Sequence, residues 1–156
     1  MDADSCPRHA RKLVIRATRR LGIQAVFAAN RPMPGTEAGN VIMEICPPGE
    51  NSADNRLVEL AEPGDLAVSR DLTLAKRLLE KGISVIDDRG RVFNPENINE
   101  LLSMRIFVVG LAESGLGVER MANYGKKESK AFADSLDRQL TKLLKSASDP
   151  VSPGDV

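Results

Sequence analysis

The sequence predicts an α/β fold: one three-layer domain with a mostly parallel sheet and helices on both faces. Two observations favour this class. Short apolar runs alternate along the chain with longer segments whose apolar residues recur at helical spacing. Gly, Pro, Asn and Asp mark most of the boundaries between them. Strands that alternate with helices pair in parallel, because each crossover helix returns the chain to the same edge of the sheet.

The length of 156 residues is typical of one domain, which we expect to span residues 1–145 and to precede a disordered tail over residues 146–156. Acidic and basic residues balance at 22 each, so the net charge indicates neither a nucleic-acid nor a membrane partner. Aromatic residues are scarce and Trp is absent, which argues against base-stacking platforms. Two cysteines and the lack of a signal peptide or long apolar run favour a reduced, cytoplasmic protein without a membrane partner.

The first half of the chain predicts two helices and two strands. Pro7 suits the first position of a helix that Gly22 ends. That helix carries one apolar stripe, and its basic residues occupy the other faces: Arg8, Arg11, Lys12, Arg16, Arg19 and Arg20. Gln24–Ala29 and Val41–Ile45 read as strands, each followed by a loop that contains Pro and Gly. A short helix is expected over Ser52–Leu60.

The second half continues the alternation. A strand at Leu66–Val68, a helix at Leu72–Lys81 and a strand at Ile83–Ile86 are expected first. A tight turn at 87–90 then leads into 91–93. After it we expect a helix from Asn94 or Pro95 to Ala112, a loop at 115–125 and an amphipathic helix over Lys127–Lys145. Gly82 ends the helix before the strand at 83–86. The sequence shows no internal repeat.

The first strand of such a sheet is cut short in this sequence. Asp2 and Asp4 stand at the junction where a strand hands over to a helix, and no strand precedes them. A doubly wound sheet places its first strand near the middle, and its absence exposes two rows of backbone donors and acceptors. We therefore expect the natural protein to carry several more apolar residues ahead of Asp2.

Four aspartates are the candidate catalytic and metal-binding residues. Asp2, Asp4 and Asp71 lie at the carboxyl ends of predicted strands, and Asp54 opens a helix that enters the same rim. Ligands bind at this edge of open α/β sheets, and clustered carboxylates are stable mainly when a cation neutralises them. Oxygen ligands select Mg²⁺ or Mn²⁺. The chemistry indicated is phosphodiester hydrolysis with water as the nucleophile.

Each of these acids has a purely structural alternative. Asp4, Asp54 and Asp71 precede or open helices and suit N-caps. Asp65 and the pair Asp87-Asp88 are more typical of turns. Other candidates are weaker: His9 is the only histidine and is expected to face outward, while Cys6 and Cys46 are expected as free thiols, with a disulfide between them as the alternative. No Walker loop, dinucleotide fingerprint, nucleophile elbow or zinc spacing is present.

Several short segments resemble the YaiI/YqxD family of uncharacterised bacterial proteins. In chain order they are Asp2–Pro7, Ala29–Pro32, Ala53–Asn55, Pro63–Leu66, Ser69–Asp71, Asn94–Ile98, Leu102–Arg105 and Phe132–Asp137. The resemblance covers nearly the whole chain. It implies a distant relationship to PIN-like nucleases, whose acidic residues bind metal at the carboxyl edge of a parallel sheet. It would assign Asp2, Asp4, Asp54 and Asp71 to that role, and Asp65 less securely.

This sequence departs from the family pattern in three places. The short apolar strand ahead of Asp2 is missing, Ile106-Phe107-Val108-Val109 stand where relatives tend to carry acids, and the glycine- and proline-rich stretch is altered over 117–121. The first hypothesis is a PIN-like metal-dependent nuclease that acts on RNA or another phosphodiester, with Arg8, Arg70 and Arg105 contacting phosphates. The alternatives are a non-catalytic binding or regulatory module with the same fold, and a small-molecule phosphatase.

Overall fold

The computed structural model describes residues 1–113 and 124–148, which form five helices and five strands. The helices are α1 (Arg8–Leu21), α2 (Ser52–Leu60), α3 (Leu72–Glu80), α4 (Pro95–Glu113) and α5 (Lys126–Ser148). The strands are β1 (Ala25–Ala29), β2 (Val41–Ile45), β3 (Leu66–Val68), β4 (Ser84–Ile86) and β5 (Val92–Phe93).

The strands form two small sheets. β1 and β2 pair in parallel, in a register that places Ala25 beside Val41. β3, β4 and β5 form the second sheet, in which β3 and β4 are parallel and β5 is antiparallel to β4. The expectation of a mostly parallel sheet is therefore confirmed, with one short antiparallel strand at its edge.

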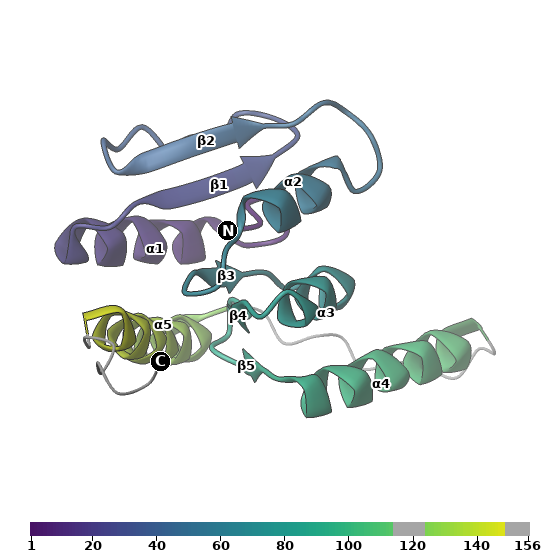
Figure 1. Ribbon diagram of the computed structural model, residues 1–156. Helices are drawn as coiled ribbons and strands as arrows, with labels where there is room; N and C mark the ends of the chain where they lie inside the picture. Colours follow the sequence, from purple (N-terminus) through teal and green to yellow (C-terminus); the bar gives the residue numbers. More distant parts are fainter. Residues whose placement is uncertain (114–123, 149–156) are drawn as a thin grey trace, which may run out of the picture.

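The amino-terminal residues lie between the two sheets (Figure 1). Asp2 forms an isolated parallel bridge with Ala28 of β1, where Ala3 N donates to Ala28 O over 3.1 Å. On the other side, Asp2 N donates to Val68 O of β3 over 2.9 Å. Residues 1–3 therefore act as the short central piece that joins the two sheets into one layer.

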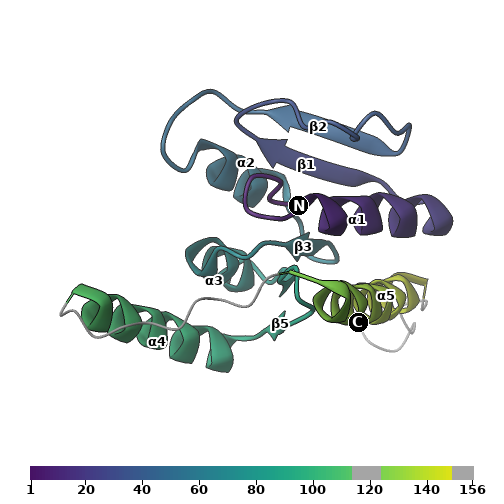
Figure 2. The ribbon, with the colours of Figure 1, turned by 180° about the vertical axis from the view of Figure 1, so that it is seen from behind.

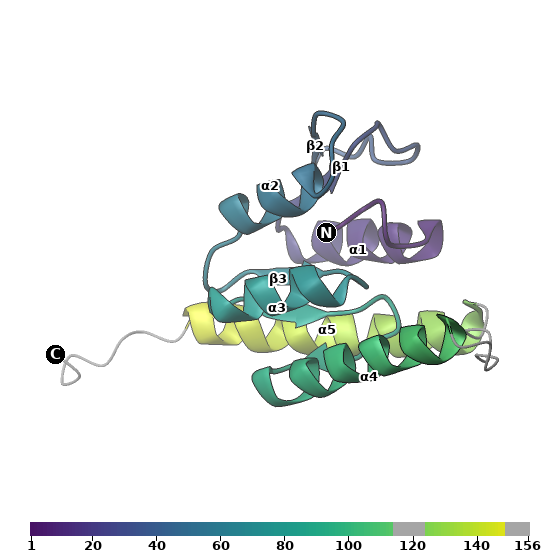
Figure 3. The ribbon, with the colours of Figure 1, turned by 90° about the vertical axis from the view of Figure 1, so that its right-hand side faces the viewer.

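The helices cover the two faces of this layer (Figures 2 and 3). One core cluster joins α1 and α5 to the strands and contains Val14, Phe27, Phe132 and Leu136. The other joins α2, α3 and α4 to the opposite face, with Leu74 among its buried side chains. Strand residues alternate between the two clusters, as the period of two along a strand requires. The three-layer α/β architecture predicted from the sequence is confirmed.

The ends of several elements differ slightly from expectation. Pro7 is the N-cap of α1 rather than its first residue, and Gly22 ends that helix with a φ of 68°, a left-handed conformation that favours glycine. α5 continues to Ser148, so residues 146–148 are helical, and the rest of the expected tail lies outside the described residues. Most of the loop expected at 115–125 also lies outside them. None of the helices in the described ranges is long and apolar enough to cross a membrane.

The turn between β4 and β5 is held against α5 at a glycine. Gly90 has a φ of 90°, and its N–H donates to Asp87 O over 3.2 Å. A Cβ at this position would lie 2.5 Å from the backbone oxygen of Ala131 in α5. Glycine is therefore required here both by the turn and by the close approach of the helix.

Candidate functional site

The candidate site lies where the carboxyl ends of β1 and β3 meet the amino-terminal residues. Asp2 is buried between the two sheets, and Asp4 is exposed on the loop that leads to α1. Asp71 follows β3 and precedes α3, while Asp54 lies in the first turn of α2. The parallel strand order brings these segments to one edge, as the sequence predicted.

Ser69 connects Asp2 to the start of α3. Its Oγ donates a hydrogen bond to Asp2 Oδ2 over 2.9 Å and accepts one from Asp71 N over 3.0 Å. Ser69 is 1% exposed and Asp2 is 4% exposed, so little water competes for either group. The hydroxyl therefore fixes the Asp2 carboxylate relative to the backbone of Asp71.

Asp71 is the N-cap of α3. Its Oδ1 accepts hydrogen bonds from Thr73 N over 2.9 Å and Leu74 N over 3.2 Å. These bonds satisfy two of the free N–H groups at the helix start, so the structural alternative for Asp71 is confirmed. A cap uses one carboxylate oxygen, and the second oxygen of the same side chain remains a candidate ligand.

Asp4 and Asp54 do not cap helices. The N-cap residues of α1 and α2 are Pro7 and Asn51, which corrects the N-cap alternative for these two acids. Asp4 Oδ2 instead accepts a hydrogen bond from Asn30 N over 3.0 Å, directly after β1. That bond ties the loop carrying Asp4 to the carboxyl end of β1.

The pKa of Asp54 is affected by the other three candidate acids. Burial raises the pKa of its carboxyl from 3.8 to about 6, and the negative charges of Asp2, Asp71 and Asp4 add to the rise. The guanidinium of Arg77 on α3 opposes it. Asp54 is therefore within electrostatic reach of the other three aspartates at this edge. Sequence spacing alone could not establish this.

Within the described residues, no three acidic, histidine or cysteine side chains already meet in the arrangement that encloses a metal ion. Mg²⁺ usually keeps several waters and binds proteins through one or two carboxylates. The described acids form no such cage, so a Mg²⁺ ion held through one or two of these carboxylates stays a prediction.

The cationic residues are arranged differently from the sequence prediction. Arg70 forms two hydrogen bonds to Asp88, from Nε to Oδ1 over 3.2 Å and from Nη2 to Oδ2 over 2.5 Å. Asp88 lies in the turn, as expected, and is also the buried partner of Arg70, with 1% of its surface exposed. Asp87 is a turn residue, because its Oδ1 accepts from the backbone N–H groups of Arg89 and Arg91.

Arg8 and Arg105 are exposed, on α1 and α4 respectively, and their contact with phosphates stays a prediction. Arg77 was missed in the sequence, although it is the cation that acts on Asp54; its Nη1 donates to Asn55 Oδ1 over 2.9 Å. It lies six residues after the Asp71 cap, in the last turn of α3, so its sequence position alone did not place it near Asp54. Ser69 and Asn30 were also missed, although each directly follows a predicted strand.

The remaining candidate residues from the sequence either have a structural role or lie away from the site. Asp65 Oδ2 accepts from Glu62 N over 2.9 Å in a turn, as expected. His9 is exposed on α1. Cys6 and Cys46 are free, which confirms the preferred reading. Burial raises the pKa of the Cys6 thiol to about 12, so it is not a thiolate nucleophile at neutral pH.

Comparison with known proteins gives a family but no activity. Residues 1–142 match the family described as "Uncharacterized BCR, YaiI/YqxD family". A UPF0178 protein of Treponema pallidum is 46% identical over 147 residues, which cover 94% of this chain and 83% of that protein. UPF0178 proteins of Treponema denticola and Myxococcus xanthus are 41% and 39% identical, each over 93% of this chain and 92% and 95% of their own lengths. No solved structure matches the chain significantly. The chain therefore belongs to the YaiI/YqxD family.

Proposed function

We propose that the protein is a Mg²⁺- or Mn²⁺-dependent hydrolase of phosphodiesters, with RNA as the preferred substrate class. The observation that carries the proposal is the Asp54 carboxyl, whose pKa of about 6 reflects burial beside Asp2, Asp71 and Asp4. Forcing like charges together in a partly buried place has an energetic cost that a bound cation removes. Folds do not determine function, so the proposal depends on this site and not on the likeness to PIN-like nucleases.

Some residues of the candidate site would bind the cation, and others would hold those ligands in position. Asp2 and Asp54 would hold the cation directly, while the free oxygens of Asp4 and Asp71 would bind its waters. Ser69 keeps Asp2 aimed at the site, because its hydroxyl donates to the Asp2 carboxylate over 2.9 Å. When bound, a divalent cation lowers the pKa of a coordinated water and neutralises charge on the phosphoryl group.

The substrate would approach from the solvent side of this edge. Arg77 lies beside Asp54, and Arg8 begins α1 just after the loop that carries Asp4. The side chain of Arg70 is 41% exposed although it pairs with Asp88, so part of it stays accessible to a phosphate oxygen. Together with Arg105 on α4, these groups would attract the polyanionic backbone, with little preference for base sequence.

The test is calorimetric titration of Mn²⁺ into the folded protein, followed by cleavage of a fluorescent single-stranded oligoribonucleotide. We expect saturable binding and Mn²⁺-dependent cleavage by the wild type, and loss of both in Asp54→Asn and Asp71→Asn. Asn caps helices as well as Asp, so Asp71→Asn keeps α3 intact. Asp137→Asn is the matched control, because Asp137 pairs with Arg20 in an exposed ion pair between α5 and the far end of α1.

Two results would contradict the proposal. If no heat of Mn²⁺ binding is detected, the metal-dependent mechanism fails. If the Asp54 and Asp71 variants bind Mn²⁺ like the Asp137 control, the cation binds elsewhere. Binding without cleavage of RNA or of a small phosphodiester would instead favour the non-catalytic binding module.

A further inference from the structure

The solvent-facing side of α1 carries a row of cations that starts next to the candidate site. The members of this cationic row are exposed and follow one another at three- or four-residue spacing, so they lie on one side of the helix: Arg8, Lys12, Arg16 and Arg19. Four residues rise about 6 Å along a helix axis, and the whole row is about 16 Å long. Figure 1 shows α1 running back alongside β1, away from the loop that carries Asp4.

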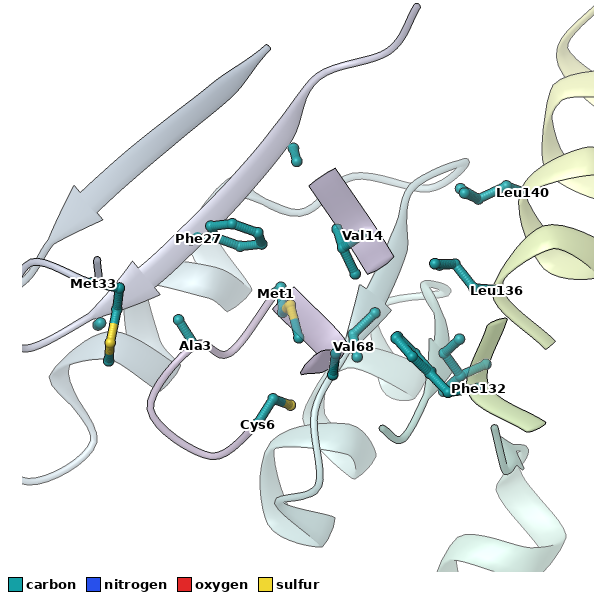
Figure 4. Close-up of a cluster of buried hydrophobic side chains, with 14 residues drawn as sticks. Met1, Ala3, Cys6, Val14, Phe27, Met33, Val68, Phe132, Leu136 and Leu140 are labelled. Atoms are coloured by element: carbon teal, nitrogen blue, oxygen red, sulfur yellow. The ribbon is translucent and has the colours of Figure 1, made fainter. Parts of the chain in front are cut away.

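The opposite side of α1 is held in the core. Val14 is buried in the same cluster as Phe27 of β1 and Leu136 of α5, as Figure 4 shows. Arg11 Nη1 donates to Cys6 O over 2.9 Å, which ties the first turns of the helix to the loop ahead of it. The cationic row therefore has a fixed position relative to the aspartates.

No acid compensates the charge of the cationic row. α1 contains no acidic residue, and within residues 1–113 and 124–148 none of the four cations forms an ion pair. Arg20 differs, because its Nη2 pairs with Asp137 Oδ1 of α5 over 2.6 Å. Like charges four residues apart destabilise a helix, and Arg8 stands in the first turn, where the helix dipole disfavours a cation. A bound anion would relieve both unfavourable interactions.

We propose that the cationic row binds successive phosphates of one RNA strand and leads that strand to the four aspartates. The choice of RNA rests on the proposed hydrolase function, to which the row adds a binding track with a direction and a length. A strand with one negative charge per nucleotide matches the row, because an extended sugar–phosphate repeat can span the distance between neighbouring cations. Such contacts position the strand without reading its bases. The substrate must therefore be several nucleotides long to fill the track.

An anionic lipid surface is the other kind of partner that a basic helix can bind. Helices that lie on a membrane bury an apolar face among the lipids and keep their cations at the headgroups. The apolar side of α1 already packs against β1 and α5, with Ala10 and Val14 buried, so only its cations are available. These contacts favour a polyanion in solution over a membrane.

The test measures RNA affinity without metal, by fluorescence anisotropy in the presence of EDTA. The probes are labelled oligouridylates of three and of nine nucleotides, and vesicles of phosphatidylserine and phosphatidylcholine test the lipid alternative. The row variant combines Lys12→Gln with Arg16→Gln. The matched control combines Arg138→Gln with Lys142→Gln, which removes the same two charges at the same spacing from exposed positions of α5. Circular dichroism of both variants checks that the fold is kept.

We expect the wild type to bind the longer RNA at least tenfold more tightly than the shorter one. The row variant should lose at least tenfold in affinity for the longer RNA, and the control should lose less than threefold. The logarithm of the affinity falls with the logarithm of the salt concentration by about 0.7 for each phosphate that a protein neutralises on a single strand, so the row variant should make this slope shallower by about 1.4. The vesicles should not bind.

Equal losses in the row variant and the control would overturn the proposal, because overall charge and not the row would then set the affinity. Equal affinity of the wild type for the two RNA lengths would also overturn it, as would vesicle binding that the row variant abolishes while RNA binding persists. Failure of the proposed hydrolase is a separate result. If Mn²⁺-dependent cleavage is absent, the metal-free affinities still decide whether the row binds RNA; if cleavage occurs and the row variant keeps its affinity for the longer RNA, only the track is wrong.

Discussion

Replacing Ser69 by Ala tests whether the hydroxyl that links Asp2 to Asp71 organises the site. The substitution removes a hydrogen bond to a carboxylate that is 4% exposed, together with the acceptor for Asp71 N. A hydrogen bond to a charged group contributes about 1.5–3 kcal/mol, and a buried group left without its partner adds a desolvation cost. We therefore expect Ser69→Ala to lower the free energy of unfolding by about 2–4 kcal/mol.

The chain offers a matched control in Ser135 of α5. Ser135 is 3% exposed, and its Oγ has no hydrogen-bond partner in the described part of the chain. Ser135→Ala removes the same atoms from an equally buried place and should change the free energy of unfolding by less than about 0.5 kcal/mol. Urea unfolding of both variants at one pH gives the two values.

A double-mutant cycle that combines Ser69→Ala with Asp2→Asn measures the interaction energy between these two residues. We expect a coupling energy between Ser69 and Asp2 of at least about 1 kcal/mol. Equal losses for the Ser69 and Ser135 variants, or additive effects of the Ser69 and Asp2 substitutions, would refute it. The same variant should also weaken Mn²⁺ binding, since the Asp2 carboxylate is no longer held in place.

Three further predictions concern charge. Burial lowers the pKa of the Met1 ammonium group from 8.0 to about 6, so the unfolded chain binds more protons than the folded one between these pH values. The free energy of unfolding should therefore rise by up to about 3 kcal/mol from pH 6 to pH 8. A free energy of unfolding in urea that does not change over this pH range would contradict this. Arg70→Ala leaves the buried Asp88 carboxylate unpaired and should lower the free energy of unfolding in urea by about 3–5 kcal/mol. Breaking the exposed ion pair between Arg20 of α1 and Asp137 of α5 should lower it by less than about 1 kcal/mol. Equal losses would show that burial of Asp88 is not decisive. Binding of single-stranded RNA should be weak, and its affinity should fall steeply as the salt concentration rises. Charge reversal at the exposed residues Arg16 and Arg19 should reduce binding, measured by fluorescence anisotropy, without loss of the helical circular dichroism signal. An affinity that does not change with salt would exclude electrostatic binding.

The regular elements followed from local rules, which is why the sequence predicted them. Gly22 ends α1 because it adopts a left-handed φ, and Asp71 begins α3 because its carboxylate accepts the first N–H groups. Short continuous apolar runs gave β1 and β3 their places. These signals act over a few residues and are visible in one chain.

The site was predicted only in part, because its contacts join distant segments. The acids were named from their positions after strands or at a helix start, yet their electrostatic effect on Asp54 depends on how β1, β3 and the amino-terminal residues pair. Asp88 reads as part of a turn in sequence, and only the tertiary fold brings Arg70 to it. Ser69 has no local signature, since its partner Asp2 lies 67 residues away. Pairings of this kind are fixed by packing and not by propensity.

The most direct test of the central claim is where Mn²⁺ binds in solution. Paramagnetic Mn²⁺ broadens the amide resonances of nearby residues, so a titration at substoichiometric metal maps the site on the assigned protein. We expect selective broadening at Ala3, Ala53 and Leu72, which adjoin Asp2, Asp54 and Asp71, while the amides of β5 and of α5 stay sharp. Broadening centred elsewhere, or none at millimolar Mn²⁺, would contradict a divalent-cation site at this edge of the sheet.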